Sequence, residues 1–202
     1  MTREQPRAIA RRERILEAAL AVFSRRGYRD AAMDEIAVEA DTSKGGLYFH
    51  FPTKQALFLH LLDRMADLLM SRAEQAIAAE ADPARQIDAA LVVLRTFATH
   101  RALARLFLID ALSAGPEAHL KLMEVHQRFA RLVARHLQAA IAAGAIAPLD
   151  TRLAGLAMFG AINEVVITWV LTGQPECLDD AYPELRAFLR RSVGLPEPSE
   201  AT

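Results

Sequence analysis

Residues 42–48 carry the groups in this chain that are best suited to contact a polyanion. They read TSKGGLY. Hydroxyl groups and a lysine can donate hydrogen bonds to phosphate oxygens or to base edges, and glycines let a phosphate backbone approach closely. Each glycine inside a helix costs roughly 1 kcal/mol relative to alanine, so two in succession indicate close packing or close contact. The stretch predicts a nucleic-acid contact, with a glycine-rich helix corner as the alternative.

Three predicted helices would position this stretch. Residues 7–26 place an apolar stripe on one helical face, and Gly27 follows where a C-terminal cap belongs. Two short helices are expected next, over about 33–40 and 43–49, with Thr42 as the N-cap of the second. Two short helices separated by about three residues after a longer one form a helix-turn-helix unit, whose second helix enters the major groove of DNA.

Composition favours helices over the whole chain. Alanine occurs 39 times among 202 residues, aromatic residues make up 6%, and no segment alternates as a strand does. Further helices are expected over residues 54–81, 83–100, 101–112, 117–143, 151–171 and 180–193, with a loop at 113–116 and with Thr53, Pro83 and Asp150 at three helix starts. The sequence predicts an all-α fold. Residues 1–53 would form a three-helix domain with the helix-turn-helix, residues 54–195 a helical domain for ligand binding and dimerisation, and residues 196–202 a disordered tail.

The N-terminal segment also follows a known pattern. It reads RILEAALAVFSRRGY from Arg14 and DEIAVEADTSKGGLYFHFPTKQALFLHLL from Asp34 to Leu62. The positions in register with the pattern are Ile36, Ala37, Ser43, Lys44, Gly45, Leu47, Tyr48, His50, Phe51 and Lys54. In these residues the segment resembles the N-terminal domain of the tetracycline-repressor (TetR) family of bacterial transcriptional regulators. The resemblance covers about a quarter of the chain, and the total length and helical remainder fit the same family.

The resemblance implies a role for each matching residue. The DNA-binding residues that it implies are Thr42, Ser43, Lys44, Gly45, Gly46, Tyr48, His50 and Lys54. The residues from Thr42 to Gly46 are implied to lie at the start of the recognition helix, near base edges or phosphates. Tyr48, His50 and Lys54 are implied to contact the phosphate backbone. The small core of this domain is expected to contain Phe23, Ile36, Leu47 and Phe51.

A few positions depart from the family pattern. Ala31 and Ala32 stand where Ser or Thr usually caps the second helix, and loss of such a cap costs about 1 kcal/mol. Asp41 replaces the usual glycine of the turn, and it tolerates a left-handed conformation better than most residues. Gly46 stands where Thr is frequent, which removes one hydroxyl. These departures weaken the expectation for particular contacts and leave the resemblance intact.

Residues 153–171 form a long apolar segment. Their number matches a membrane span, but Asn163 and Glu164 lie at the middle, where charge is expensive in a bilayer. A soluble helix that is apolar all round is buried on two sides, here against its own chain and a second copy. The last helix adds an apolar stripe, Leu178, Tyr182, Leu185 and Leu189, widened by Phe188. A homodimer without a membrane partner is predicted, and the core helix of a monomer is the alternative.

The helical domain is also expected to hold a small-molecule site. Its candidate lining residues combine apolar side chains with sparse polar groups: Met65, Leu69, Phe97, His100, Phe107, Asp110, Met123, His126, Phe129 and Asn163. A cavity of this kind binds mostly apolar molecules, so the expected effector is hydrophobic or amphipathic. Taken singly, each of these residues fits an ordinary core position better.

No catalytic residue, metal site or cofactor is predicted. The chain lacks the G-x-S-x-G elbow, the phosphate loop, the H-E-x-x-H motif and the dinucleotide fingerprint. His119 and His126 are seven residues apart, too far to share one metal ion. A single cysteine, Cys177, suits a reducing compartment, and the charged N-terminus does not resemble a signal peptide. A cytoplasmic protein is therefore expected.

Charge gives weaker information about the partner. The net charge of −1 divides into +2 over residues 1–54 and −3 over the remainder. A mildly basic head on a mildly acidic body does not by itself identify a nucleic-acid partner, because strong binders are usually more basic.

Together these features predict a ligand-responsive transcriptional regulator. In the form that we favour, it is a repressor that binds a palindromic operator in double-stranded DNA as a dimer and is released by a small, largely apolar effector. Two other classes stay open: a helical interaction or adaptor protein whose helix-turn-helix is vestigial, and an enzyme. Sequence-specific DNA binding would separate the regulator from both.

Overall fold

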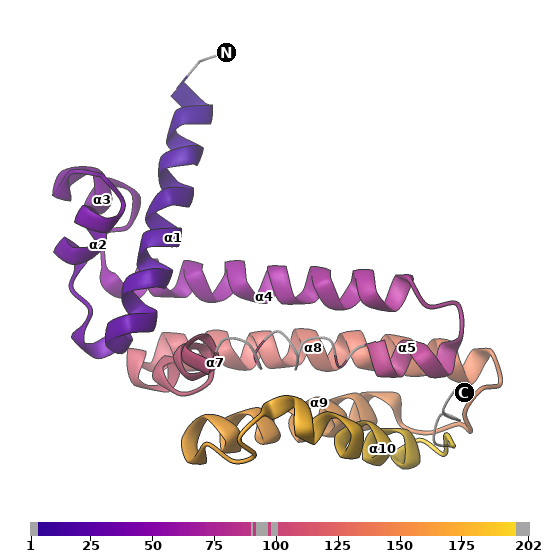
Figure 1. Ribbon diagram of the computed structural model, residues 1–202. Coiled ribbons are helices and arrows are strands. Elements are labelled where there is room, and N and C mark those ends of the chain that lie inside the picture. Colours follow the sequence, from indigo (N-terminus) through magenta and orange to yellow (C-terminus); the bar gives the residue numbers. More distant parts are fainter. Residues whose placement is uncertain (1–3, 90, 92–96, 98–100, 197–202) are drawn as a thin grey trace. The chain divides into compact units, whose positions relative to one another are not determined.

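The computed structural model describes residues 4–89, 91, 97 and 101–196, and every regular element in this part of the chain is helical (Figure 1). The N-terminal helices are α1 (Glu4–Asp30), α2 (Met33–Glu39), α3 (Lys44–His50) and α4 (Lys54–Ala78). They are followed by α5 (Pro83–Ala89), α7 (Arg101–Leu108), the 3-10 helix η1 (Asp110–Ala114), α8 (Pro116–Ala142), α9 (Thr151–Thr172), the 3-10 helix η2 (Leu178–Ala181) and α10 (Tyr182–Ser192). The all-α prediction is confirmed.

The backbone packs into two compact units. The first comprises residues 1–66 and 105–122, and the second comprises residues 67–104 and 123–202, each within the described ranges. Helices α4 and α8 both begin in the first unit and end in the second, so each is a continuous covalent connection between them. The domain boundary expected after residue 53 lies inside the first unit.

Apolar side chains from four helices form the core of the first unit. Phe23, Ile36, Leu47 and Phe51 are each at most 1% exposed, which confirms the predicted core. Phe58 of α4 is fully buried beside them, and its ring lies edge-to-face to that of Phe23 with 5.5 Å between centroids. Burial of large side chains stabilises by about 1.5–3 kcal/mol each, so this packing holds α3 in place through Leu47.

Several helix ends lie where local signals predict them. The Thr53 hydroxyl and the Asp150 carboxylate accept hydrogen bonds from backbone amides three residues on, at 2.9 and 3.0 Å, and Pro83 begins α5. Gly173 caps α9 with a left-handed φ of 76°. Gly27 leaves helical geometry as predicted, but α1 continues for three more residues beyond it.

Other predicted boundaries are wrong. The helix expected over 101–112 ends at Leu108, and η1 extends into the expected loop. A local contact accounts for this, because the Ser113 hydroxyl donates to the Asp110 carbonyl at 2.7 Å and stabilises a tight turn. The last helix begins at Tyr182 after η2, and α4 ends at Ala78. The helix expected over 83–100 is observed as far as Ala89; most of its remainder, like residues 197–202 of the expected tail, lies outside the described residues.

Helix α9 is the one described helix that is long and apolar enough to cross a membrane, and 33% of its apolar window is buried. On one side it packs against its own unit through Met158 and Trp169, which are 5% exposed. Gly155 lies so close to α8 that a Cβ at this position would be 2.5 Å from a backbone carbonyl oxygen. Leu153 and Leu156 are more than half exposed. One side of α9 is therefore covered by its own chain, while another remains open.

The apolar stripe predicted on the last helix packs within its own unit. Leu178, Leu185 and Leu189 are at most 7% exposed. The guanidinium of Arg190 pairs with Asp88 of α5 at 3.0 Å, which ties α10 to α5. Phe188 is 54% exposed and is the large apolar side chain of α10 that stays open to solvent.

Candidate DNA-binding site

The turn between α2 and α3 depends on one left-handed residue. Asp41 has a φ of 48°, in the region that its residue type was predicted to tolerate. Its amide donates to the Val38 carbonyl at 3.1 Å, and the amide of Thr42 donates to the Ala37 carbonyl at 3.0 Å. The N-cap of α2, Ala32, makes no side-chain hydrogen bond, as the missing hydroxyl implies. The two helices thus form a tight helix-turn-helix.

Ser43 caps α3, and the expectation that Thr42 would do so is wrong. The Ser43 hydroxyl accepts a hydrogen bond from the amide of Gly46 at 3.1 Å. A Cβ at Gly46 would lie 2.8 Å from the Thr42 hydroxyl oxygen and 3.2 Å from that of Ser43, whereas a Cβ at Gly45 would meet nothing within 4 Å. A side chain at Gly46 would therefore press on the Thr42 side chain beside the cap, whereas Gly45 faces open space.

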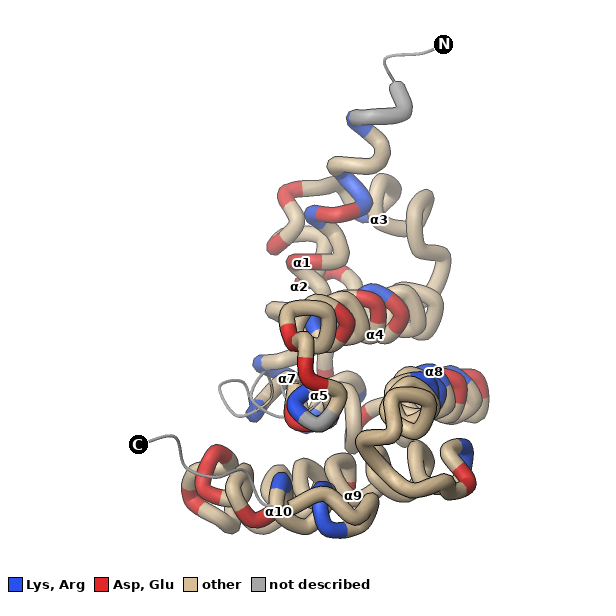
Figure 2. The backbone as a smooth tube through the Cα atoms, turned by 90° about the vertical axis from the view of Figure 1, so that its right-hand side faces the viewer, with Lys and Arg blue, Asp and Glu red and all other residues tan. Residues whose placement is uncertain are grey.

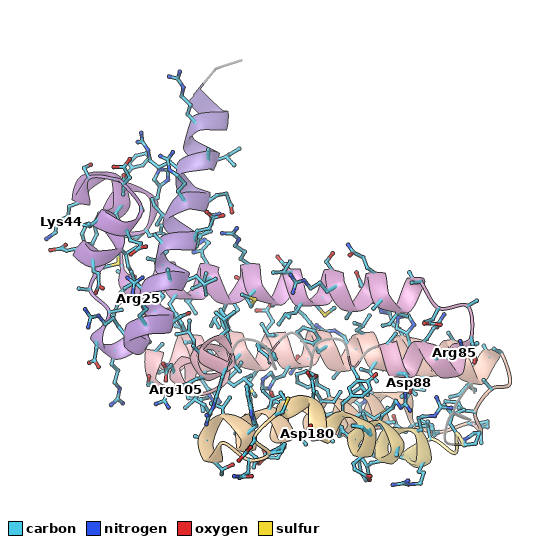
Figure 3. All side chains as sticks on the ribbon, in the orientation of Figure 1. Arg25, Lys44, Arg85, Asp88, Arg105 and Asp180 are labelled. Atoms are coloured by element: carbon cyan, nitrogen blue, oxygen red, sulfur yellow. The ribbon has the colours of Figure 1, made fainter. Side chains whose placement is uncertain are left out.

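Lys44 is held by an ion pair across the turn. Figure 3 labels Lys44 at the start of α3. Its ammonium lies 2.8 Å from a carboxylate oxygen of Asp34 on α2, and both side chains are almost two-thirds exposed. The hydrogen bond to Asp34, followed by its charge, raises the pKa of Lys44. An exposed pair of this kind stabilises the fold little, because solvent screens it. Lys44 thus stays charged and can exchange Asp34 for a phosphate or a base edge at small cost.

Lys54 is engaged by the protein itself. Its ammonium donates to the carbonyls of Arg29 and Ala31 at 2.9 and 3.0 Å, and it lies 4.9 Å from the ring centroid of Tyr28. Burial raises the pKa of Tyr28. The first residue of α4 therefore closes the connection between α1 and α2. This arrangement differs from the free phosphate contact that the resemblance implies, because two of the three ammonium hydrogens are already used.

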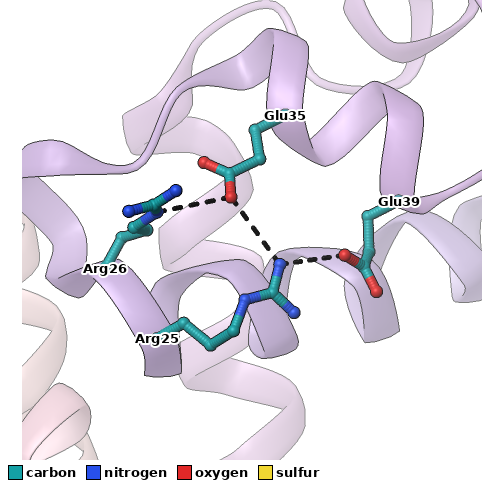
Figure 4. Close-up of polar contacts among 4 residues, drawn as sticks. All are labelled: Arg25, Arg26, Glu35 and Glu39. Carbon is teal, nitrogen blue, oxygen red and sulfur yellow. Dashed lines mark hydrogen bonds and ion pairs between the residues drawn. The ribbon is translucent and has the colours of Figure 1, made fainter.

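Arginines at the end of α1 pair with acids of α2 (Figure 4). Arg25 lies 2.9 Å from Glu39 and 3.7 Å from Glu35, and Arg26 lies 3.4 Å from Glu35. The hydrogen bond to Glu39 is the main reason that the pKa of Arg25 is raised. Both signs of charge are also interspersed along α1 and α4 (Figure 2). Positive charge in these helices is thus accompanied by negative charge, at the end of α1 through the ion pairs with Glu35 and Glu39.

Phe49 of α3 is absent from the predicted DNA-binding residues, although its side chain is open to solvent. It is 85% exposed, while its neighbour Tyr48 is 40% exposed. Its ring meets that of His50 edge-on at 5.3 Å. Helical spacing was the available signal, because Phe49 lies two residues beyond the buried Leu47 and therefore on the opposite face of the helix. Hydrogen-bonding capacity does not mark an exposed apolar residue of this kind.

Comparison with known families agrees with this geometry. The model described as bacterial regulatory proteins, tetR family, matches residues 15–61, and the model described as tetracyclin repressor-like, C-terminal domain, matches residues 80–171. The chain belongs to the TetR family.

The relatives of this TetR-family chain are regulators rather than enzymes. The fatty acid metabolism regulator protein of Bacillus subtilis is 28% identical over 164 residues, which cover 79% of this chain and 84% of the relative. The transcriptional activator FasR of Mycolicibacterium smegmatis is 42% identical over 90 residues, 45% of this chain and 41% of the relative. Among solved structures, the regulator FadR of Bacillus subtilis in complex with stearoyl-CoA superposes with a TM-score of 0.79 at 24% identity, covering 90% of this chain and 97% of that one.

The effector-site residues predicted for this TetR chain fall on both units. Met65, Phe107 and Asp110 belong to the first unit, and Leu69, Phe97, Met123, His126, Phe129 and Asn163 belong to the second. His100 lies outside the described residues. Within the second unit, the Phe129 ring stacks on Phe159 at 5.5 Å, and the His126 ring lies 5.2 Å from Phe159. The Asp110 carboxylate lies beside Gly27 of α1 and 3.8 Å from Arg105. Asp110 therefore packs against the end of α1.

Three hollows of the second unit can be outlined from residues that the structure describes, and the predicted effector residues are not among the linings of these three. The first is a small apolar cavity of about 20 Å³, lined by Ile77, Gln86, Leu91, Val133, His136, Met158, Ile162 and Leu189. Burial lowers the pKa of His136, the neighbouring charge of Arg135 lowers it further, and Glu74 acts in the opposite direction. The second is an open groove of about 580 Å³, lined by Gln127, Ala130, Arg131, Ala134, Asp150, Arg152, Leu153 and Leu156. The third, of about 300 Å³, lies beside the end of α9.

Proposed function

We propose that this TetR-family chain is a homodimeric repressor that binds a palindromic operator through α3 and releases it when an amphipathic acyl effector binds the second unit. The helix-turn-helix carries the proposal. It has a tight turn at Asp41, a capped recognition helix and a buried anchor at Leu47. These features are what a docked recognition helix needs. A regulator that binds chromosomal DNA would act in the cytoplasm.

The choice of effector rests on the relatives together with the composition of the second unit. A protein similar over 79% of this chain is named as a fatty acid metabolism regulator, and a protein of the same fold was crystallised with stearoyl-CoA. A long-chain acyl-CoA is an amphipathic molecule, which is the class predicted from the apolar character of the helical domain. It is therefore the first effector to test.

Dimerisation is supported by the open side of α9. Leu153, Leu156 and Leu171 are 63, 53 and 61% exposed, and Phe188 of α10 is 54% exposed. Exposed apolar side chains gathered on two consecutive helices favour burial against a partner. A second copy of the chain would cover these side chains and would also supply the second recognition helix that a palindrome requires.

Release would follow from a shift in populations. An effector in the second unit would favour an arrangement in which the two α3 helices no longer match half-sites about 34–36 Å apart. Helix α4 is the proposed lever, because it begins in the first unit with Lys54 and ends in the second.

Repression is the simpler of the two modes of transcriptional regulation. Both modes occur among the relatives, since KstR of Mycolicibacterium smegmatis is named a repressor and FasR an activator. A repressor needs only to occupy its operator, whereas an activator also needs a surface that recruits polymerase.

Operator selection from random duplexes tests the DNA-binding part of the proposal. The full chain is expected to enrich a palindromic site and to bind it at least about a thousandfold more tightly than unrelated DNA at the same salt concentration. An adaptor with a vestigial helix-turn-helix, or an enzyme, would enrich no sequence. Failure to enrich any site would contradict the proposed function.

A further inference from the structure

The face of α3 opposite Leu47 combines an exposed apolar ring with a position that has no side chain. A helix turns by about 100° per residue, so Gly45 and Phe49, two positions before and after the fully buried Leu47, both lie within about 20° of the opposite direction. Gly45 has no neighbouring atom where a Cβ would point. Phe49 is 85% exposed, more than any other large apolar residue in the described part of the chain.

Polar groups of α3 lie beside this face. Lys44 forms an ion pair with Asp34 of α2 at 2.8 Å. The imidazole of His50 lies edge-on to the Phe49 ring. The most exposed large apolar side chain that the structure describes is thus a hydrocarbon ring, and four residues before it Gly45 has no side chain.

An exposed phenylalanine on a recognition helix has one apolar partner among the base edges of the major groove. That partner is the C5-methyl group of thymine, since the other groups displayed there are hydrogen-bond donors and acceptors. Contact requires the helix backbone to come close to the bases, and the missing side chain at Gly45 allows this.

We infer that Phe49 is a specificity-determining residue that reads a thymine C5-methyl group in each half-site, with Gly45 permitting the approach. The inference rests on the proposed function, because it requires α3 to enter the major groove. It names the feature of the operator that this side chain recognises.

Replacement of thymine by deoxyuridine in the selected operator tests the inference, because it removes the methyl group and keeps base pairing. Each thymine pair related by the dyad is replaced in turn, and affinity is measured at fixed salt for the wild-type chain and for Phe49→Ala. At one position, wild-type affinity is expected to fall about fourfold per half-site, or about fifteenfold for both, from the loss of a buried methyl group. For Phe49→Ala the same replacement is expected to change affinity by less than about 1.5-fold.

Leu120→Ala serves as the matched control, because Leu120 is also exposed, at 69%, and lies on α8. It should keep the full sensitivity to deoxyuridine. Thermal unfolding and affinity for unrelated DNA verify that Phe49→Ala remains folded. If no thymine position affects wild-type binding, or if Phe49→Ala keeps the wild-type sensitivity, this inference is wrong while the proposed function stands. If the wild-type chain selects no operator, both are wrong.

Discussion

Two neighbouring glycines at the start of α3 meet different needs. A side chain at Gly46 would collide with the hydroxyls of Thr42 and Ser43, and the Ser43 hydroxyl is the cap that begins the helix. Gly45 has no such neighbour. No neighbouring atom in the folded protein therefore requires a glycine at position 45. The absence of a side chain there would instead let the backbone of α3 approach DNA.

A pair of alanine substitutions separates these needs. Gly45→Ala is expected to raise the free energy of unfolding by a few tenths to about 1 kcal/mol through helix propensity, yet to weaken operator binding. Gly46→Ala is expected to gain less, because the Thr42 side chain must move to admit the added Cβ. Chemical denaturation of the full chain and operator titration provide the measurements. Equal stability of the two variants would contradict the assignment.

At the scale of elements, Lys54 ties α4 to the end of α1 and to the link that leads to α2. It is the first residue of α4, and its ammonium binds the carbonyl of Arg29 in α1 and that of Ala31 in the link. Removing the donor would take this hydrogen bond from the partly buried Ala31 carbonyl. The geometry of the helix-turn-helix relative to α1 depends on this contact as well as on the apolar core.

Lys54→Met is therefore expected to lower the free energy of unfolding by about 1–3 kcal/mol, while the slope of log affinity against log salt for DNA changes little. Lys44→Met is the matched control, because the ion pair of Lys44 with Asp34 is exposed and stabilises the fold little. This control should keep stability and lose about one unit of salt slope if Lys44 contacts a phosphate. If Lys54→Met instead unfolds like the wild type and loses a unit of slope, Lys54 is a phosphate ligand.

The sequence was most informative where structure depends on a few neighbouring residues. The left-handed Asp41, the caps at Thr53 and Asp150 and the buried Leu47 follow from local chemistry or helical spacing. The choice of Ser43 over Thr42 as cap depends on one residue of register, which propensity does not resolve.

Contacts between segments that are distant in the sequence could not be predicted from neighbouring residues. The position of the Lys54 ammonium depends on carbonyls more than twenty residues away. Apolar residues such as Leu69, Phe97 and Phe129 share helical faces with true core positions, so their pattern does not distinguish a cavity lining from a filled core. The three hollows outlined by described residues are lined by other residues, such as His136 and Arg152, and the effector-site prediction stays a prediction.

At the scale of the whole molecule, Phe188 tests the proposed dimer. Phe188→Glu would place an unpaired carboxylate in the interface, at a cost of several kcal/mol, and is expected to yield a folded monomer at micromolar concentration. Leu189→Glu is a poor choice, because Leu189 is 2% exposed within its own unit and its replacement would unfold the chain. Sedimentation velocity and circular dichroism distinguish these results. A wild-type monomer, or a Phe188→Glu dimer of unchanged affinity, would contradict the dimer through α10.

The central claim is that effector binding and operator binding oppose each other. The most direct measurement is the dissociation constant of the selected operator as stearoyl-CoA is added, with free coenzyme A and stearate as controls. Coupling is reciprocal, so operator DNA must weaken stearoyl-CoA binding by the same factor. Saturating stearoyl-CoA is expected to weaken operator binding at least about tenfold, while free coenzyme A leaves it unchanged. An operator affinity unaffected by stearoyl-CoA and by the other long-chain acyl-CoA thioesters would contradict the proposed coupling.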